Sequence, residues 1–550
     1  MNSLIIAGIG LIFFVISYLF YGNYLEKLWG IDKDRITPSF AKKDGIDYIP
    51  AKHWVVLFGH HFSSIAGAGP ILGPVIAVCL FGWAPALLWI ILGSIFLGGV
   101  HDFSSLFLSV RNDGQTVGDI TKKILGDKSK IIFSLFLWFS LILVVSVFSA
   151  VTAKTFIEQP EIVIPTFFLI FDAIIFGFLV YKKNSSIFYS TILCLFLLFL
   201  FFIFGKEIPV IIKTITPLKF WISILLLYSF IASILPVNIL LQPRDYLSSF
   251  ILFSGILFGY IGLISSHPKV KAPFYISFFS ENGSLWPMMF VMIACGAISG
   301  FHSLVSSGTT SKQIANEKDI KKIGYGGMLT EGFLSILALL CVSAGLLWNS
   351  QFPEINYPDL MKKGDWIGTF ATGYGYILKR IFDIKIGKLF AIIMVNSFVL
   401  TTLDTATRIT RYITEELFGE TFKIKFLKNR YISTLIVIIF SGYLAFGNWQ
   451  KIWPVFGASN QLVAGIVLLV CSCYLIMKKK NSISTLIGAI FMFLTTMTAL
   501  TLGMIKFYKN KNFLLGNISL ILILLSIFII NEGIKVLKIE IKKRRENGEI

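Results

Sequence analysis

The chain has 550 residues, of which 55% are hydrophobic and only 14% are charged. Average soluble proteins are nearer a quarter charged, so this chain carries too little charge to form a water-facing surface along its whole length. Its many large apolar side chains, including 53 phenylalanines, also exclude intrinsic disorder. The composition is that of a polytopic membrane protein.

The net charge of +19 does not indicate nucleic-acid binding, because the basic residues are scattered through short loops between apolar segments. This distribution is typical of proteins that take their orientation in an inner membrane from basic loops. All six cysteines lie inside apolar segments, and Cys471 and Cys473 are too close together for the usual spacing of paired zinc ligands. We expect the lipid bilayer as a partner, no nucleic acid, no bound metal and no cofactor.

Fifteen apolar segments are long enough to cross a bilayer, which takes about 20 helical residues. The first is expected to remain as a helix, because no basic residues precede it and no clear signal-peptide cleavage site follows it. We therefore expect an all-α polytopic membrane protein with about 15 transmembrane helices. The segments lie near residues 3–21, 53–81, 83–108, 131–151, 162–181, 187–204, 219–240, 247–264, 286–308, 328–349, 388–407, 431–447, 453–477, 484–505 and 513–530.

The positions of the lysines and arginines predict the orientation of the chain. If the N-terminus is outside, most of the 49 basic residues fall in inner loops, chiefly 22–52 and 109–130, and in the tail that contains Lys542–Arg545. Such an excess is typical of the cytoplasmic side. We expect a multi-pass protein of a bacterial inner membrane with a cytoplasmic C-terminus. The loop 350–387 is then outside despite its basic residues.

Four segments contain glycines or prolines that disfavour a continuous helix, because proline removes an amide donor and clustered glycines are costly in a helix. Unwound backbone at membrane depth is tolerated inside protein or beside a watery cavity, and in secondary transporters it binds substrate and coupling ion. A single kink can serve packing alone, but several breaks beside polar groups favour a binding site. The expected breaks lie at Gly67–Pro70, at Ser233–Asn238, at Gly296–His302 and near Pro454.

Several ionisable residues share one depth, in the inner half of the expected membrane, by a rise of 1.5 Å per helical residue. An ionisable group there costs at least roughly 2.5–3.5 kcal/mol if it faces lipid, so a shared polar layer is the more stable arrangement. We expect His302 and one of His60 and His61 to face a common cavity with Asp102. The residues at this depth are His60, His61, His101, Asp102, His302 and Asp404.

Several of these ionisable residues also have simpler, purely structural interpretations. Asp404 lies one helical turn before Arg408, so an ion pair between them with a purely structural role is equally consistent with the sequence. His101 alone is consistent with a hydrogen-bonded core residue. Lys154 and Glu331 lie at the ends of apolar segments and are expected at the membrane interface. No partner for Asp172 is visible in the sequence.

The string GHHFSSIAGAGPILGP at 59–74 resembles the signature of the carbon starvation protein A family. Further strings of the family follow in the same order and extend the resemblance over nearly the whole chain. They are LPVNILLQPRDYLS at 235–248, CGAISGFHSLVSSGTTSKQ at 295–313, YGGMLTE at 325–331, LDTATRITRY at 403–412 and WPVFGASNQL at 453–462.

The resemblance implies an inner-membrane uptake system for small carbon sources, linked to pyruvate and to peptides. Members of this family resemble distant relatives of the amino acid–polyamine–organocation transporters, which are built on a five-plus-five inverted repeat. The segments fit this leucine-transporter-like scheme, with the broken spans 53–81 and 219–240 opening the two halves. The expected parts are an extra helix and inner loop at 1–52, a first repeat at 53–204, a second at 205–430, and a four-helix accessory region with a basic tail at 431–550.

We therefore expect a secondary active transporter, not an enzyme, that imports pyruvate or short peptides during carbon starvation, by proton symport. Free amides at a helix break favour a carboxylate, and histidine carries protons near neutral pH. The expected substrate-binding residues are His60, His61, Ser63, Ser64, Gly67, Ala68, Gly69, Pro236, Asn238 and His302. The expected coupling residues are His61, Asp102, His302, Ser306, Ser307, Thr309, Thr310 and Asp404.

Three alternatives remain open at this stage. A sodium-coupled carboxylate symporter would use the hydroxyl groups between Ser306 and Thr310 as ion ligands. An intramembrane metal or haem protein would use the histidines and Asp102, but the sequence contains no HExxH, Walker A or CxxCH motif. A starvation-linked sensor or passive channel would lack concentrative uptake. The sequence does not predict the oligomeric state.

Overall fold

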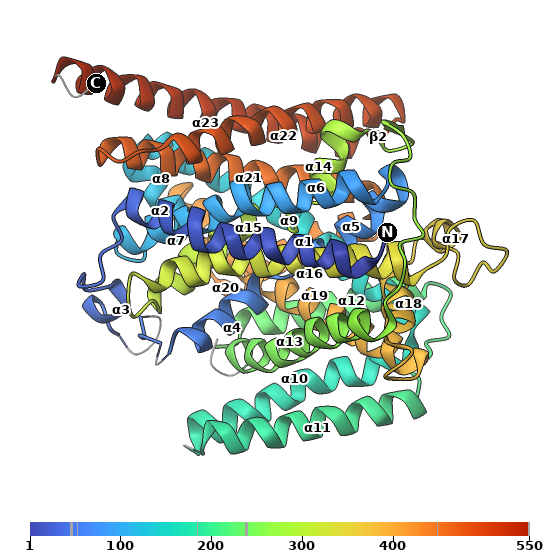
Figure 1. Ribbon diagram of the computed structural model, residues 1–550. Coiled ribbons are helices and arrows are strands. Elements are labelled where there is room, and N and C mark those ends of the chain that lie inside the picture. The colour runs from blue at the N-terminus through green and yellow to red at the C-terminus, as the bar shows by residue number, and fades with distance from the viewer. Residues whose placement is uncertain (45–47, 52, 184, 237–239, 448, 548–550) are drawn as a thin grey trace.

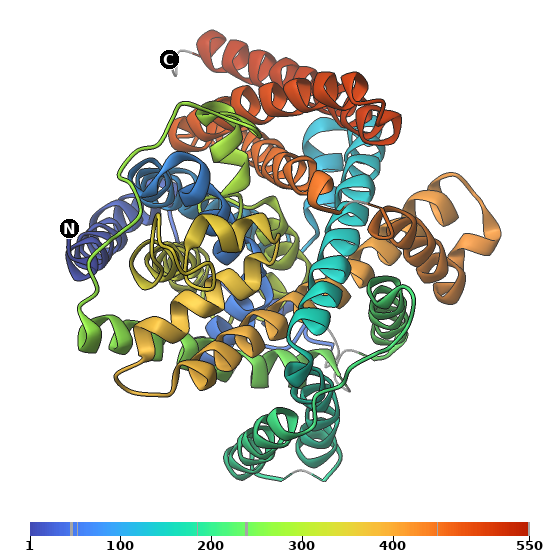
Figure 2. The ribbon, with the colours of Figure 1, turned by 90° about the vertical axis from the view of Figure 1, so that its right-hand side faces the viewer.

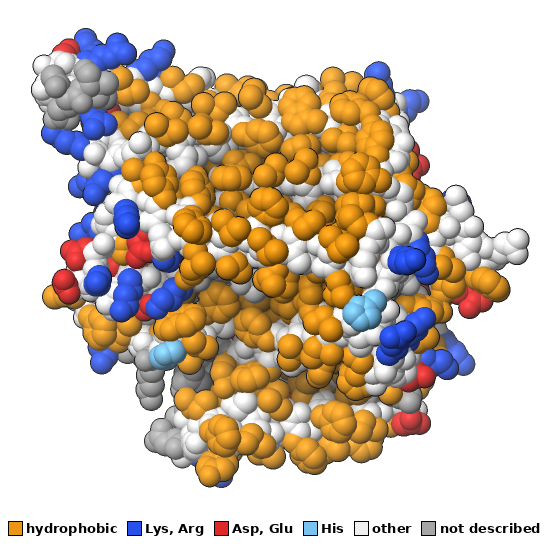
Figure 3. Space-filling model, in the orientation of Figure 1, with side chains coloured by type: hydrophobic (Ala, Val, Ile, Leu, Met, Phe, Trp, Pro, Cys, Tyr) orange, Lys and Arg blue, Asp and Glu red, His pale blue; other side chains and the backbone are white. Residues whose placement is uncertain are grey.

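The computed structural model describes residues 1–44, 48–51, 53–183, 185–236, 240–447 and 449–547. Long helices run side by side through the molecule (Figure 1). Hydrophobic side chains cover the face between the two ends, while charged side chains gather toward the ends (Figure 3). This arrangement confirms the predicted polytopic helical membrane protein.

The chain forms the following helices and strands, in order. They are α1 (Ser3–Ile16), α2 (Asn23–Trp29), α3 (Pro38–Ala41), α4 (Trp54–Ile65), α5 (Gly69–Phe81), α6 (Trp83–Gly93), α7 (Gly99–Arg111), α8 (Val117–Leu125), α9 (Asp127–Glu158), α10 (Val163–Gly177), α11 (Ile187–Glu207), α12 (Pro217–Ile234), α13 (Leu241–Ser266), β1 (Phe279–Ser280), β2 (Gly283–Ser284), α14 (Phe290–Met292), α15 (Gly300–Gly308), α16 (Gly326–Gly345), α17 (Tyr357–Lys362), α18 (Trp366–Leu378), α19 (Ile384–Thr414), α20 (Arg430–Ala445), α21 (Trp449–Met477), α22 (Ile483–Lys509) and α23 (Phe513–Glu546). The strands β1 and β2 pair antiparallel.

The predicted number of fifteen spans is not confirmed. Within the described residues, 12 helices are long and apolar enough to cross a membrane, or 13 spans if the bent pair α4–α5 counts as one. The segment near 286–308 is divided between the π-helical turn Leu285–Met289, α14 and α15, and α20 has only 16 residues.

The first interruption separates α4 from α5, whose axes differ by 48°. α4 ends at Ile65 and α5 begins at Gly69, with Pro70 in its first turn, where a proline needs no amide partner. A Cβ atom on Gly69 would lie 2.5 Å from Cys295 Sγ. Only glycine therefore allows this close approach between the start of α5 and the chain just beyond α14.

The second interruption lies between Met292, where α14 ends, and Gly300, where α15 begins. Asn460 of α21 holds the start of α15, because its Oδ1 accepts from Phe301 N at 2.9 Å and its Nδ2 donates to Ser299 Oγ at 3.0 Å. Ser94 Oγ donates to the Gly296 carbonyl at 3.0 Å. Polar side chains from neighbouring helices thus satisfy backbone groups that a continuous helix would have paired.

The other two expected breaks do not interrupt a span. In the segment near 219–240, α12 ends at Ile234, inside the expected break Ser233–Asn238, and the next span, α13, begins at Leu241. Residues 237–239, which include the end of this break, lie outside the described residues. Leu235 is extended (φ −69°, ψ 149°), because Pro236 disfavours the helical conformation of the residue before it. α21 runs unbroken through Pro454, which lies within its first two turns. Pro454 is the sixth residue of the helix, so it removes one helical hydrogen bond, to the Gln450 carbonyl, without ending the helix.

If the hairpin α10–α11 is left aside, the core helices form two matching series of five. Each series opens with one of the two interrupted helices. The third member of each series is its longest helix, α9 with 32 residues and α19 with 31, and these two pack against each other. The fourth members, α12 and α20, each pack against both α9 and α19. The fifth members, α13 and α21, pack against α4 and α15, the interrupted helices of their own series. This is a five-plus-five core of the leucine-transporter type.

Two helical hairpins lie outside this core. α10 and α11 pair with each other at one edge, and α22 and α23 lie at the opposite edge (Figures 1 and 2). α1 packs against α16 on the face of the core. The core therefore contains both interruptions, although α22 also contacts α14 and the turn Leu285–Met289, which precede the second one.

Candidate functional site

A chain of buried ionisable side chains joins α7, α15 and α16 just beyond the second interruption. His302 is the third residue of α15, and its Nδ1 lies 2.7 Å from Asp102 Oδ2. Its Nε2 lies 3.1 Å from Glu331 Oε2 of α16. His101 Nδ1 lies 2.7 Å from the other oxygen of Asp102. All four side chains have an exposed fraction of 0%.

The contacts of His302 determine how many protons this group of buried side chains holds. A neutral imidazole carries one N–H, so it can donate to Asp102 through Nδ1 and then presents a lone pair at Nε2. A lone pair facing an ionised Glu331 without water would be strongly unfavourable. One further proton must therefore sit on His302 Nε2 or on Glu331, although their contact does not have hydrogen-bond geometry in this conformation.

The two adjacent histidines of α4 point to different neighbours. His61 is fully buried, and its Nδ1 lies 2.8 Å from Thr310 Oγ1. His60 faces Asp245 of α13, with 4.0 Å between Nδ1 and Oδ2. The sequence-based expectation placed one of the pair with His302 and Asp102. The structure brings neither into hydrogen-bond contact with them, although His61 lies against Gly327, in the first turn of α16.

A second buried network joins α12, α13 and α19. Arg244 Nη2 donates to Asp404 Oδ1 at 3.0 Å and to Asp245 Oδ1 at 3.1 Å. The Tyr228 hydroxyl donates to Asp404 Oδ2 at 3.0 Å. Arg244 and Asp404 have no exposed surface. The network continues toward α4 through Ser64, whose hydroxyl lies 3.4 Å from Asp245 Oδ2.

Arg408 does not form the ion pair that its spacing from Asp404 suggested. Its Nη2 donates to the carbonyls of Ala232 and Leu235 at 2.6 and 2.7 Å, at the C-terminus of α12. A cation there also interacts favourably with the helix dipole. Asp404 therefore pairs with Arg244 instead, a residue to which the sequence analysis gave no role.

Most of the hydroxyl groups expected to bind sodium are occupied by hydrogen bonds within the protein. Ser307 donates to the Ser303 carbonyl at 2.7 Å, and Thr309 donates to the Val305 carbonyl at 3.0 Å. Thr310 is the partner of His61. Hydroxyls in helices commonly bond their own backbone in this way. Of this group only Ser306 has a buried hydroxyl without a hydrogen-bond partner among the described residues.

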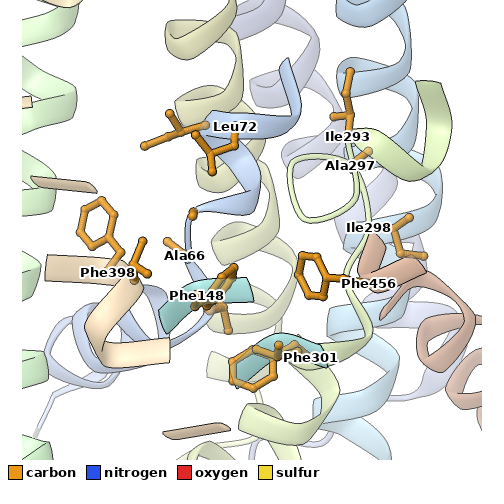
Figure 4. Packing of buried hydrophobic residues seen from close by; sticks show 14 of the residues in the cluster. Ala66, Leu72, Phe148, Ile293, Ala297, Ile298, Phe301, Phe398 and Phe456 are labelled. Atoms are coloured by element: carbon orange, nitrogen blue, oxygen red, sulfur yellow. The ribbon is translucent and has the colours of Figure 1, made fainter. Parts of the chain in front are cut away.

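The space between the two interruptions is filled by apolar side chains. Figure 4 shows Phe148, Phe301 and Phe456 between Ala66 at the first interruption and Ile298 at the second. The rings of Phe148 and Phe456 have centroids 5.6 Å apart. All five residues are buried. The conformation is therefore closed around the interruptions.

The remaining residues predicted to bind substrate lie in α4, at the first interruption or after the end of α12. Ser63 and Ser64 donate to the His60 carbonyl within α4, and Gly67 and Ala68 form the interruption itself. Pro236 is exposed after the end of α12. Asn238 lies outside the described residues. Among the described residues, no three His, Cys, Asp or Glu side chains are grouped so that they could hold a metal ion.

Sequence reasoning missed three important residues. Glu331, expected at the interface, is fully buried against His302. Arg244 and Asp245 were quoted within a family string but given no role, because they precede the apolar segment at 247–264. A signal was present in that charged Arg-Asp pair, which directly precedes an apolar segment and follows Pro243.

The comparison with protein families decides the membership of the chain. The model of the family described as carbon starvation protein CstA matches residues 2–367 and 358–499. The chain belongs to the carbon starvation protein CstA family. The match covers both interruptions and both buried networks, and it ends within α22.

Relatives in this family carry transporter names. The peptide transporter CstA of Campylobacter jejuni is 31% identical over 88% of this chain and 78% of its own length. The peptide transporter CstA of Bacillus subtilis is 30% identical over 97% of both chains. The pyruvate/proton symporter BtsT of Escherichia coli is 29% identical over 89% of this chain and 80% of its own length.

Solved structures show the same fold at low sequence identity. A mutant of the Eremococcus coleocola manganese transporter is 11% identical with a TM-score of 0.51, over 89% of this chain and 98% of the transporter. The same transporter in complex with an aromatic bis-isothiourea compound gives 12% identity and the same TM-score, over 92% of this chain and 100% of the transporter. The CstA-family chain thus shares its helical architecture with a transporter.

Proposed function

We propose that this protein is a secondary active transporter that imports a small carboxylate, either pyruvate or a short peptide, together with protons during carbon starvation. The names of its relatives, peptide transporter and pyruvate/proton symporter, support this function. The excess of basic residues in the inner loops supports a bacterial inner membrane with the N-terminus outside. In this orientation, α4 begins at the inner face.

The contact of His302 with two carboxylates carries the proposal. His302 follows the second interruption by three residues and holds a proton that can move between it and Glu331. A proton couples to transport only if its affinity differs between the inward-facing and outward-facing states. Because Asp102, His302 and Glu331 come from three helices, any relative movement of α15 changes that affinity. Further candidates for coupling are His61, which lies against the start of α16, and Asp404 of the second buried network.

The substrate carboxylate is proposed to bind at the first interruption. The backbone between Ala66 and Gly69 leaves the helix there, and the amides at the start of α5 favour an anion. A Cβ atom on Gly67 would lie 3.0 Å from Thr402 Oγ1 and 3.5 Å from Phe148. The amides, a hydroxyl and an aromatic surface together suit a small organic acid. His60, His61, Ser63 and Ser64 lie on the preceding helix.

The boundaries of the two repeats are proposed to differ from those suggested by the sequence. The first repeat comprises α4 to α9 with α12 and α13, and the hairpin α10–α11 is an insertion. The second repeat runs from the turn at Leu285 through α21. Both repeats then open with an interrupted helix, as in other inverted-repeat transporters. The extra helix α1 and the hairpin α22–α23 are additions to the core.

The test is uptake of labelled pyruvate and of a labelled dipeptide into proteoliposomes that contain the purified protein. Separate experiments impose a proton gradient and a sodium gradient. We expect at least one substrate to accumulate when the outside is acidic, in sodium-free buffer, and a protonophore to collapse that accumulation. Uptake that requires sodium at constant pH would overturn the proposed coupling. Failure to accumulate either substrate under either gradient would overturn the transport function.

A further inference from the structure

A large cavity with many charged lining residues lies away from the two buried networks, at the end of the bundle where α17 is found (Figure 1). Its volume is about 810 Å³, and its walls come from the ends of α5 and α9, from α14 and α17, and from the facing ends of α21 and α22. Among its described lining residues, five lysines face a single acidic residue, Glu281. The lysines are Lys154, Lys362, Lys363, Lys451 and Lys506.

Two of these lysines are held in place without being neutralised. Lys154 Nζ donates to the Lys363 carbonyl at 3.2 Å, and Lys506 Nζ donates to the Glu281 carbonyl at 2.8 Å. A carbonyl oxygen fixes the position of an ammonium group but leaves its full charge. Lys362 has a carboxylate partner, Asp359, at 3.2 Å. The cavity therefore has a positive potential, which a concave wall concentrates.

A column of aromatic rings leads from this cavity to the first interruption. Trp366 and Trp453 line the cavity, with ring centroids 5.7 Å apart. Trp453 contacts Phe456 at 5.4 Å, and Phe456 contacts Phe148 at 5.6 Å. Phe148 in turn lies against Gly67. These ring contacts connect the cavity to the first interruption without involving an ion pair.

We propose that this lysine-lined vestibule is a low-affinity collecting site for small organic carboxylates, which the aromatic column separates from the binding site at Gly67. This inference rests on the proposed transport function and adds a second anion site to it. The volume is too large for tight binding of one small acid. Their charge instead raises the local concentration of anions and the rate at which they arrive. The vestibule also accounts for basic residues in a loop that the orientation places outside.

The phosphate of a lipid headgroup offers the same negative charge as a carboxylate. Several of these lysines are exposed near the end of the membrane-spanning helices, so both sources must be separated by experiment. We commit to the soluble carboxylate, because the lysines are arranged around a cavity that contains aromatic residues at its base. A lipid headgroup held by these lysines would make their effect depend on the presence of phospholipid.

The first measurement is the kinetics of proton-driven uptake in proteoliposomes for Lys363→Gln and Lys451→Gln. We expect KM to rise by about 3- to 10-fold with kcat nearly unchanged, and the salt dependence of KM to become weaker. Lys451→Arg should behave as the wild type. The control is Lys213→Gln, at an exposed lysine between α11 and α12 that does not line the cavity. An unchanged KM in both glutamine variants, with normal wild-type uptake, would overturn the vestibule but not the transport function.

The second measurement does not depend on transport. Iodide and caesium quenching of tryptophan fluorescence is compared in wild type and Trp366→Phe, in phosphate-free detergent micelles. We expect the Trp366 contribution to be quenched more by iodide than by caesium, pyruvate to protect it, and Lys363→Gln to reduce the difference. Equal quenching by both ions would overturn the positive vestibule. An iodide preference that appears only after phospholipid is added, or that pyruvate does not reduce, would assign the lysines to lipid headgroups and overturn the proposal.

Discussion

Asp404 of α19 accepts a hydrogen bond from the Arg244 guanidinium at 3.0 Å, and neither side chain has any exposed surface. Arg244 belongs to the first turn of α13, so the pair ties the start of one span to the middle of another. Tyr228 donates to the same carboxylate from α12. A buried ion pair of this kind stabilises the fold little more than a well-packed apolar pair would. Removing one partner is strongly destabilising, however, because the other charge stays buried and unpaired.

We therefore predict that Arg244→Met will destabilise the folded protein by about 3–5 kcal/mol, because it leaves both Asp404 and Asp245 buried without their cation. Asp404→Leu should cost less, because Arg244 keeps Asp245 as a partner. The double variant should recover part of the loss seen in Arg244→Met, because Asp245 alone then stays unpaired. Thermal unfolding of the detergent-solubilised protein measures the effect, with exposed Arg430→Met as the control. A double variant that is less stable than both single variants would contradict this reading of the pair.

We predict that Gly67→Ala will remove uptake while the protein still folds. The added methyl group would approach Thr402 Oγ1 to 3.0 Å and would favour helix where the backbone now turns away from it. Uptake and size-exclusion profiles are the measurements. Gly8→Ala is the matched control, because a Cβ there has no neighbour within 4 Å. Full uptake by the Gly67 variant would remove the interruption from the transport route.

Gly69 is expected to behave differently from Gly67. A Cβ at Gly69 would come within 2.5 Å of Cys295 Sγ and 2.7 Å of its Cβ. Gly69→Ala must therefore separate α5 from the chain beyond α14, and we predict a loss of folded protein as well as of uptake. The measurement is the yield of monodisperse protein after extraction. A variant with normal yield and normal uptake would show that the two interruptions do not need this close contact.

Asn460 provides a test of the second interruption. Its side chain bonds Phe301 N and Ser299 Oγ, and both groups are buried. Asn460→Leu should cost about 1–3 kcal/mol for each buried polar group that it leaves unpaired. We predict lower thermal stability and a loss of uptake, with Asn517→Leu in α23 as a control at an exposed amide. Unchanged stability would mean that other groups hold the start of α15.

The sequence predicted that a buried polar layer exists, but it did not predict all of the residues that form it. Depth alone brought His302 and Asp102 together, because ionisable groups at one level have few stable positions except against each other. Glu331 was placed at the interface because its apolar segment begins near residue 328. In the structure that span begins at Lys321, through a π-helical turn, so Glu331 lies ten residues inside it. Arg244 was missed for the same reason at the start of α13.

Partners that come from distant helices could not be read from spacing along one helix. Asp404 and Arg408 stand at the spacing of a helical ion pair, yet each bonds a group from another element. The break expected in 219–240 was likewise not found inside a span, because a proline can end one helix as readily as it can interrupt one. The second interruption is located by Asn460 and Ser94, which approach it only in the folded core.

In the proposed mechanism, His302 and Glu331 together hold the proton that couples uptake to the proton gradient. Glu331→Gln keeps the shape of the side chain but cannot release a proton, so the shuttle between Nε2 and Oε2 is lost. We predict that this variant will fail to accumulate substrate under an imposed proton gradient, with uptake reduced at least about 10-fold, yet will still exchange labelled for unlabelled substrate across the membrane. Coupling is lost while binding and the conformational cycle remain. The matched control is Glu532→Gln on α23, a carboxylate paired with Lys535 at the surface. Proton-driven accumulation at the wild-type level in Glu331→Gln would show that the coupling proton lies elsewhere. Loss of exchange together with accumulation would instead assign Glu331 to the fold or to the binding of substrate.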